Sequence, residues 1–294
     1  MLNIINLHKS FNEKTVLDGV NLQVEEGSIF GLVGINGSGK STLLRCISGV
    51  YETDFGMVLF NDVNTYQTPK VRKDIIYVSD DVYFPANATL KSLKVFYKTF
   101  YDLDEDKYVK YLDMFGLNEN TQISNFSKGM KRQSILCFAL AIKPKLLLLD
   151  ECFDGLDPLV RLTFKKVLVD LLEDNKTSVI ISSHNLKELE DICDSFGILE
   201  NGKIDTYGDL LASKENIVKF QLAYKINKSK DYFKNLNILS YKQEGKVITM
   251  VVKGNIEEAR ELLKESKPLI YDEIPVNFEE LFIYEVESRG LLNE

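Results

Sequence analysis

The chain has 294 residues, 45% of them hydrophobic, which is enough for one large domain or for a domain with a smaller appendage. Its 36 Lys and Arg stand against 44 Asp and Glu, and the formal charge of -8 argues against a general nucleic-acid binder. No apolar run reaches the ~18 residues that span a bilayer, and we expect no signal peptide, because strand-like residues begin at Leu2. Four scattered cysteines predict free thiols in a reducing cytoplasm.

The first part of the chain is predicted to form strands. Residues 2–7 and 16–24 are strand-like, and we expect the second strand to be broken at Asp18-Gly19. The apolar run at 29–33 predicts a third strand.

A glycine-rich loop follows that third strand. Residues 34–42 read GINGSGKST and fill the pattern G-x-x-x-x-G-K-[ST], and apolar residues at helical spacing come directly behind them. Such a loop directs backbone N–H groups at phosphate oxygens, and the helix start adds free donors and a positive dipole end. Lys40 is predicted to neutralise the outer phosphates and Ser41 to ligate magnesium. We therefore predict that the chain binds a nucleoside triphosphate through Gly34, Ile35, Asn36, Gly37, Ser38, Gly39, Lys40, Ser41 and Thr42.

The middle of the chain combines strands with a helical insertion. Short strands are predicted at 57–60 and 75–78, and two apolar stripes at helical spacing make 85–145 helical. The continuously apolar run at 145–150 is typical of a strand buried in a parallel sheet.

Further signals lead to an α/β arrangement. Asp157, followed by Pro158, has the N-cap and first-turn residues of a helix start. Residues 178–182 predict another buried strand, and 198–207 predict a hairpin closed by a type I′ turn at Asn201-Gly202.

The pattern changes after about residue 211. A strand is predicted at 217–224, a hairpin at 241–252, an amphipathic helix near 256–263 and a final helix beginning near Asn277. Residues 212–294 therefore predict a small accessory α+β unit, in which no chemical motif is recognisable.

Four further segments follow the phosphate loop in a specific order. They are NFSKGMKRQ at 125–133, LLLLDE at 146–151, GLD at 155–157, and His184 after a strand. This order of Walker A, signature, Walker B, D-loop and switch histidine resembles the ATP-binding cassette (ABC) ATPases over residues 1–211. The resemblance implies an α/β P-loop cassette with a mostly parallel core sheet, an antiparallel β-subdomain and a helical subdomain, followed by the small α+β unit.

The resemblance also implies an ATPase with ATP and Mg²⁺ at its site. Asp150 at a strand end would hold magnesium opposite Ser41, and Glu151 would polarise the attacking water as general base. His184 would contact the γ-phosphate, and Lys40 would stabilise the transition state. A solvated acidic pair is the alternative for Asp150 and Glu151, and a structural histidine is the alternative for His184.

In the resembling proteins two cassettes pair head to tail. Each ATP lies between the Walker A loop of one cassette and the signature of the other, so Ser127 and Gly129 would contact the partner's nucleotide, and Asp157 in the D-loop is a further candidate contact. The pair could be a homodimer or a heterodimer. A simple helix cap is the alternative role for Ser127.

Two further positions correspond to nucleotide-site positions of the family. Phe11 lies where the family stacks an aromatic ring on adenine, with a core role as the alternative. Asp80 occupies the position of the Q-loop glutamine, where a carboxylate can still bind magnesium or its water, although the amide donor is lost. An ordinary solvated loop aspartate is the alternative for Asp80.

Departures from the family pattern favour a bacterial-type exporter. FSKGM at 126–130 replaces L-S-G-G-Q, Cys-Phe-Asp at 152–154 replaces a Pro-Thr type segment, and the tail at 275–286 weakly resembles the end of exporter ATPases. The chain would be a cytoplasmic motor on the inner face of the membrane, driving a separate transmembrane permease and binding no nucleic acid. Val82, Tyr83 and Phe84 are candidate permease contacts.

Three other functions are compatible with a cassette. An importer motor is the hardest to separate from an exporter. A soluble ABC ATPase acting on ribosomes or DNA is disfavoured, because the chain has one cassette, no long heptad repeat and an acidic charge. A sensor that binds without hydrolysing is disfavoured by the presence of Glu151 and His184.

Overall fold

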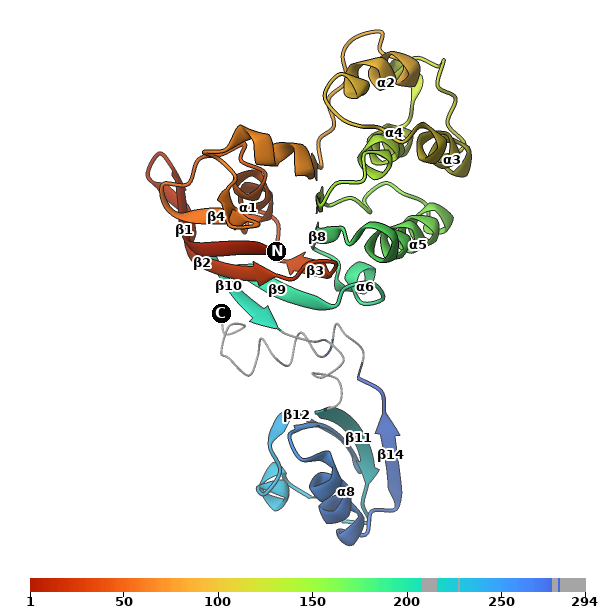
Figure 1. Cartoon of the computed structure of the whole chain (residues 1–294). Helices are drawn as coiled ribbons and strands as arrows, with labels where there is room; N and C mark the ends of the chain where they lie inside the picture. The colour runs from red at the N-terminus through yellow and green to blue at the C-terminus, as the bar shows by residue number, and fades with distance from the viewer. Residues whose placement is uncertain (208–215, 227, 277–279, 281–294) are drawn as a thin grey trace. The chain divides into compact units, whose positions relative to one another are not determined.

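The computed structural model describes residues 1–207, 216–226, 228–276 and 280 (Figure 1). The chain divides into two compact units, Met1–Tyr207 and Gly208–Glu294. The helix predicted near Asn277 and most of the exporter-like tail at 275–286 lie outside the described residues.

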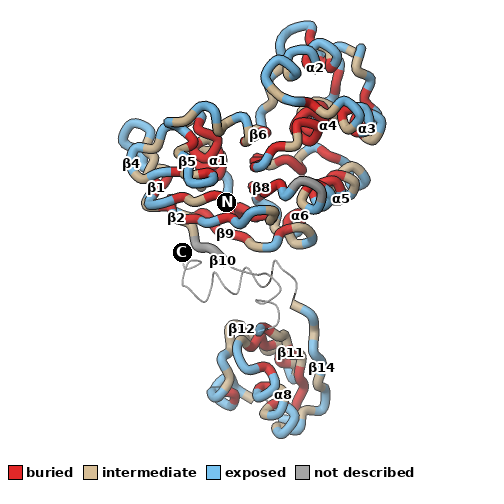
Figure 2. Tube along the Cα trace, in the orientation of Figure 1, coloured by how far each residue is buried: buried red, intermediate tan, exposed pale blue. Residues whose placement is uncertain are grey.

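A six-stranded sheet forms the centre of the first unit. In spatial order its strands are β10 (Lys203–Tyr207), β9 (Ser195–Glu200), β3 (Ile29–Val33), β8 (Ser178–Ser183), β7 (Leu146–Asp150) and β6 (Ile75–Val78). All neighbours run parallel except β9 and β10, which pair antiparallel. Every residue of β3, β7 and β8 is buried, as expected for parallel strands covered on both faces (Figure 2). The carboxyl ends of these strands therefore meet at one edge, where open parallel sheets bind ligands.

A second, antiparallel sheet contains the N-terminus. Its strands in spatial order are β2 (Lys14–Val24), β1 (Leu2–Phe11), β4 (Phe55–Phe60) and β5 (Val63–Asn64). The predicted break at Asp18-Gly19 is wrong, because β2 continues through it. Leu7 pairs with Val20 and His8 with Asp18, so Gly19 is an extra residue with φ of 75°. A β-bulge at a glycine thus takes the place of the expected break.

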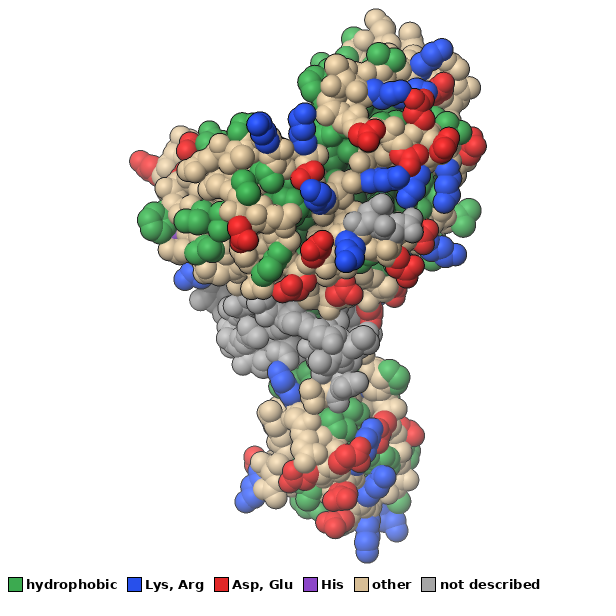
Figure 3. Space-filling model, viewed as in Figure 1, with side chains coloured by type: hydrophobic (Ala, Val, Ile, Leu, Met, Phe, Trp, Pro, Cys, Tyr) green, Lys and Arg blue, Asp and Glu red, His purple; other side chains and the backbone are tan. Residues whose placement is uncertain are grey.

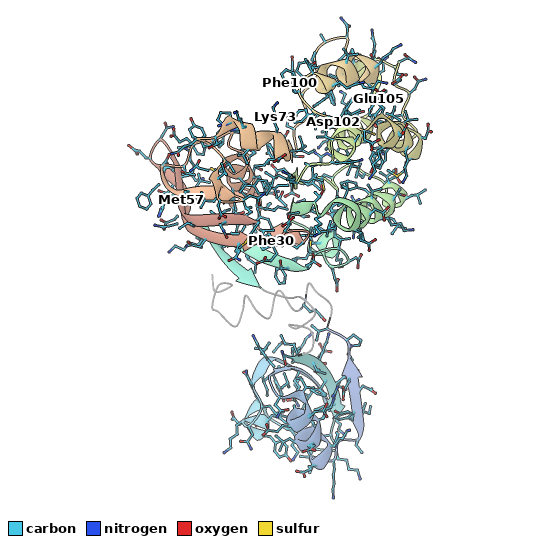
Figure 4. The ribbon with its side chains drawn as sticks, in the orientation of Figure 1. Phe30, Met57, Lys73, Phe100, Asp102 and Glu105 are labelled. Atoms are coloured by element: carbon cyan, nitrogen blue, oxygen red, sulfur yellow. The ribbon has the colours of Figure 1, made fainter. Side chains whose placement is uncertain are left out.

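The core of the first unit joins the two sheets through α1 (Lys40–Ile47). This helix packs against β7 and β2, and its Leu43 and Leu44 are fully buried with residues of both sheets. In Figure 4, Phe30 lies within this core on β3, whereas Met57 on β4 lies at the outer side of the antiparallel sheet.

Three helices within 85–145 form a separate region of the first unit. They are α2 (Leu90–Lys98), α3 (Glu105–Phe115) and α4 (Lys128–Ala141), and the 3₁₀ turn η2 (Ile123–Asn125) lies between α3 and α4. Another 3₁₀ turn, η1 (Pro69–Asp74), precedes β6. Phe138 of α4 stacks on Tyr97 of α2 at 4.6 Å and on Tyr108 of α3 at 5.1 Å between ring centroids. These aromatic contacts hold the three helices together. Along the described residues, no helix combines the length and apolarity needed to cross a bilayer.

The remaining elements of the first unit agree with the sequence signals. Asp157 caps α5 (Pro158–Asn175), and α6 (Leu186–Leu189) follows β8. Asn201 and Gly202 have φ of 48° and 75°, as the predicted type I′ turn between β9 and β10 requires.

The second unit is a four-stranded antiparallel sheet with one helix. Its strands in spatial order are β12 (Ile238–Glu244), β13 (Val247–Lys253), β11 (Ile217–Ala223) and β14 (Ile270–Ile274), with the helix α8 (Ile256–Glu265) and the 3₁₀ turn η3 (Lys230–Phe233). Helix α8 packs against β13, and its Ala259 and Leu263 share a core with Phe220 and Met250. This small core is separate from that of the first unit.

Candidate active site

The predicted phosphate loop connects β3 to α1 at the ligand-binding edge of the sheet. Gly39 precedes α1 and provides no side-chain cap, which leaves the first N–H groups of the helix without a side-chain acceptor. Lys40 is only 6% exposed, and its Nζ donates to the carbonyl oxygens of Gly34 at 2.6 Å and Ile35 at 3.3 Å. The loop thus folds around one buried ammonium group.

Glu151 meets that ammonium group from the end of β7. Its Oε1 lies 3.2 Å from Lys40 Nζ, and its Oε2 lies 2.9 Å from His184 Nδ1 and accepts from the His184 backbone N–H at 3.3 Å. A carboxyl oxygen of Asp154 falls within 4.8 Å of the ligand-type atoms of Glu151 and His184. The structure therefore brings together Lys40, Glu151 and His184, which are far apart in sequence and are the three residues predicted as catalytic.

The backbone of Glu151 is also unusual. Its φ is 47°, a left-handed conformation that is uncommon for a residue other than glycine. Its N–H donates to Ser182 Oγ at 3.1 Å and to the Ser182 carbonyl at 3.2 Å. The neighbouring strand β8 thus supports the strained turn that presents the carboxylate.

Asp150 is a buried carboxylate held by two hydroxyl groups. It is 1% exposed, Oδ1 accepts from Ser182 Oγ at 2.7 Å, and Oδ2 accepts from Tyr77 OH at 2.9 Å. Burial, together with the charge of Asp150, raises the pKa of Tyr77 well above its usual range, so this hydroxyl stays a donor. No ion pair of Asp150 occurs among the described residues. A buried negative charge without a cationic side chain fits a site for a divalent cation, and the role of Ser41 as a second oxygen ligand stays a prediction.

The signature residues surround the first turn of α4. Ser127 is exposed and accepts a hydrogen bond from Met130 N–H at 3.2 Å, so it does cap the helix. A Cβ on Gly129 would lie 2.5 Å from the Gly155 carbonyl oxygen, which means that the signature packs tightly on the segment after Glu151. Asp157 caps α5 by accepting from two backbone N–H groups at 3.1 Å. Capping is compatible with the predicted nucleotide contacts, which stay predictions.

Asp80 is placed beside α4 rather than alone in a loop. Arg132 Nη2 donates to its Oδ1 and to its carbonyl oxygen, both at 2.6 Å. The carboxylate is half exposed, and one of its oxygens is occupied by this ion pair. Its assignment as a magnesium ligand stays a prediction, and so does the alternative of a solvated loop aspartate, which here also pairs with Arg132.

Phe11 lies at the end of β1 and is 40% exposed. The ring makes an edge contact with Tyr51 at 5.4 Å between centroids. An exposed aromatic ring does not belong to the core, so the structure excludes the alternative role. Lys9 Nζ lies 5.4 Å from the ring centroid, and stacking of the ring on a base stays a prediction.

Comparison with known proteins identifies the family. The sequence profile described as ABC transporter matches residues 17–154. YtrB, an ABC transporter ATP-binding protein of Bacillus subtilis, is 34% identical over 284 residues, covering 96% of this chain and 97% of YtrB. The chain belongs to the ABC transporter ATPases. It is therefore an ATP-binding subunit that hydrolyses ATP, as the motif order predicted.

Two further relatives cover a smaller share of this chain. The methionine import protein MetN of Clostridioides difficile is 31% identical and covers 71% of this chain and 68% of MetN. The lantibiotic transport protein SrtF of Streptococcus pyogenes is 30% identical and covers 69% of this chain and 89% of SrtF. A solved ATP-binding subunit of an ABC transporter matches with a TM-score of 0.67 at 28% identity, covering 73% of this chain and 92% of that one. The predicted fold is confirmed.

Three residues of the ABC site were missed by sequence reasoning. Tyr77 and Ser182 hold Asp150, and Arg132 holds Asp80. A signal existed for Ser182, since it ends a predicted parallel strand, as Asp150 does, and the two are register partners. Arg132 gave only a weak signal, a charged residue within a helix whose buried face could not be read from its mixed sequence.

Proposed function

We propose that this cassette is the cytosolic motor of an exporter and drives a separate transmembrane permease. The observation that supports its catalytic part best is the position of the Glu151 carboxylate, between Lys40 Nζ at 3.2 Å and His184 Nδ1 at 2.9 Å. A carboxylate in that position faces the phosphate loop and can act on a water molecule there.

The proposed reaction is an in-line displacement at the γ-phosphorus of ATP. The water oxygen forms a bond to phosphorus, the bond to the bridging β–γ oxygen breaks, and Glu151 accepts the proton from the water, leaving ADP and inorganic phosphate. His184 orients the Glu151 carboxylate, and Lys40 stabilises charge on the phosphate oxygens. Magnesium, held by Asp150 and Ser41, would neutralise further phosphate charge.

A second cassette is proposed to complete the nucleotide site. The exposed N-terminus of α4, at Ser127 and Gly129, offers free backbone donors and a positive dipole end to an anion. In a head-to-tail pair this helix start would meet the partner's ATP. Capture of the complex distinguishes a second copy of this chain from a different cassette as the partner.

A surface for the permease is proposed next to the Asp80 loop. An apolar cavity of about 390 Å³ lies between the loop at 83–88 and helices α2 and α4. Tyr83 is 87% exposed and Phe96 is 58% exposed at its rim. Figure 3 shows apolar side chains exposed in this region of the first unit. A helix of the permease would bury these side chains, and this cavity includes two of the three contacts predicted from sequence, Tyr83 and Phe84.

The export direction is the finer part of the proposal. It is supported by the Lys128-containing signature and by the segment at 152–154, which depart from the family pattern and resemble bacterial exporter cassettes more than importers. The relatives do not decide it, because one carries a methionine import name and another a lantibiotic transport name.

The first test captures the partner. Tagged Glu151→Gln protein is expected to bind ATP but to hydrolyse it about 100- to 10,000-fold more slowly, because general-base catalysis is lost, so that the closed ATP-bound complex accumulates. It is recovered from gently solubilised membranes with ATP and magnesium, and the co-purifying proteins are identified. A multi-span permease supports the proposal, whereas ribosomal or DNA-associated proteins without a membrane protein contradict it. Hydrolysis at the normal rate would remove Glu151 from its role.

The second test determines direction. The same complex is then produced with Glu151 intact, because the Glu151→Gln variant hydrolyses ATP too slowly to drive transport. It is reconstituted in vesicles with the cassettes facing outward, and ATP is added outside. An exporter moves a labelled substrate into the vesicle lumen, and an importer empties preloaded vesicles.

A further inference from the structure

One buried guanidinium group joins two loops of the active site. Arg132 in α4 is 2% exposed, and it donates from Nη2 to the Asp80 carbonyl and carboxylate oxygens and from Nη1 to the carbonyl oxygen of Glu151. The planar fork of arginine makes all three contacts from a fixed geometry, which a lysine could not reproduce. The loop after β6 is thereby connected to the turn after β7.

The charge balance of this connection depends on Asp80. Among the described residues, Asp80 is the one ion-pair partner of Arg132, with 2.6 Å between Oδ1 and Nη2. The two ends differ in exposure, since the side chain of Arg132 is 2% exposed and that of Asp80 is 51% exposed. Loss of Asp80 would leave a buried cation without a counter-charge, whereas loss of Arg132 would leave a carboxylate that water can solvate.

The other end of the connection fixes the backbone of Glu151. This residue has φ of 47°, its N–H is bound to Ser182, and its carbonyl oxygen is bound to Arg132. Because the direction of the Glu151 carboxylate follows from this main-chain conformation, the guanidinium contributes to aiming it at Lys40 and His184.

We propose that Arg132 is a positioning residue for ATP hydrolysis, which holds the main chain of Glu151 in its productive conformation only while Asp80 neutralises it. The position of the Asp80 loop thereby controls the catalytic carboxylate through one side chain. Tyr83 and Phe84, proposed above to face a permease, continue the same loop. This inference rests on the proposed role of Glu151 as general base.

The test is a double-mutant cycle on the purified full-length chain. The variants are Asp80→Asn, Arg132→Gln and their combination, and kcat, KM, ATP affinity and the thermal midpoint are measured for each. The matched control is Asp74→Asn, which removes a carboxylate from an ion pair with Lys145 at 3.0 Å at the opposite end of β6 and β7. Asp74→Asn is expected to leave kcat within twofold of the unmodified protein.

Each single variant is expected to lower kcat about 10- to 100-fold, since a displacement of about 1 Å at a reacting group costs this much, while ATP affinity stays within twofold. The losses in the double variant should not multiply, because both changes break the same connection. Asp80→Asn should also lower the thermal midpoint, and adding Arg132→Gln to it should raise the midpoint again. Arg132→Lys should keep the midpoint closer to normal and still lose kcat.

Several outcomes would overturn the inference. It fails if both single variants behave like Asp74→Asn, if the losses in kcat multiply, or if kcat falls only together with ATP affinity and folding. Normal hydrolysis by Glu151→Gln would instead contradict the proposed function itself. An inactive Glu151→Gln alongside fully active Asp80 and Arg132 variants would refute the Arg132 connection alone.

Discussion

The buried ammonium group of Lys40 is shared by several acceptors, namely two carbonyl oxygens and one carboxylate. Its Nζ donates to Gly34 and Ile35 and lies 3.2 Å from Glu151 Oε1. Bound phosphates would compete with Glu151 for this charge. ATP binding would then release the Glu151 carboxylate from Lys40 and leave it bound to His184.

Replacing Lys40 with Ala is therefore expected to weaken ATP binding. A hydrogen bond to a charged group contributes about 1.5–3 kcal/mol, which corresponds to an affinity loss of about 10- to 150-fold. Fluorescent-nucleotide titration measures this loss, and Lys145→Ala, which removes an exposed lysine at the far end of β7, serves as the control. Equal ATP affinity in the Lys40 variant and the control would contradict the phosphate-loop assignment.

At the same scale, the sequence predicted which residues carry charge but not how they are held. Asp150, Glu151 and His184 could be proposed because each stands at the end of a strand or directly after it, in a motif of fixed order. Their supports could not, because Tyr77 and Arg132 reach them from elements whose packing depends on the whole chain. Contacts made by long side chains across elements leave little trace in local sequence patterns.

At the scale of elements, the start of α4 packs directly against the segment after Glu151. The close approach of Gly129 to the Gly155 carbonyl oxygen leaves no space for a side chain. We expect Gly129→Ala to push the first turn of α4 away from this segment and to reduce hydrolysis at least about tenfold, because a misplacement of about 1 Å is costly at a reacting site. ATP binding to the chain's own phosphate loop should be retained, since that loop lies on other elements.

The control for this change is Gly116→Ala at the end of α3, where a Cβ would meet no neighbour but φ is 64°. It should lower stability by about 1 kcal/mol through backbone strain and leave hydrolysis unchanged. A Gly129 variant with normal kcat, or one that has lost ATP affinity as well, would show that the tight contact has no such role.

Element prediction succeeded where burial imposes a clear pattern. The apolar runs of β3 and β7 and the Asn-Gly turn before β10 are strong local signals, and the structure confirms them. The edge strand β14 was missed because its residues are half or fully exposed and do not alternate. At Gly19 a glycine was taken as a break, whereas pairing on both sides keeps the strand continuous around a bulge.

At the scale of the whole molecule, the four thiols all lie in the first unit. Cys46, Cys137, Cys152 and Cys193 are buried and unpaired, and the second unit contains no cysteine. Thiol chemistry therefore reports on unfolding of the cassette unit alone. Burial raises the pKa of Cys46 to about 12 and raises the pKa of the other three thiols as well. A thiol that stays protonated is a poor nucleophile.

The folded chain is accordingly expected to resist a disulfide reagent at pH 8, and all four thiols should react together on unfolding.

The raised pKa values also make stability depend on pH. Below the unfolded thiol pKa of about 8.5 both states are protonated and the full contribution is present, whereas above it only the unfolded state ionises, so stability falls as the pH rises toward 12. For Cys46 this loss is about 1.4 kcal/mol for each pH unit in that window. Urea unfolding at pH 7.5 and 9.5, followed by thiol reactivity, measures the loss, and Cys46→Ala should show a smaller decrease between the two values. Rapid labelling of the folded protein at pH 8, or an equal pH dependence in the Cys46 variant, would contradict this account, because either result requires a thiol that water already reaches.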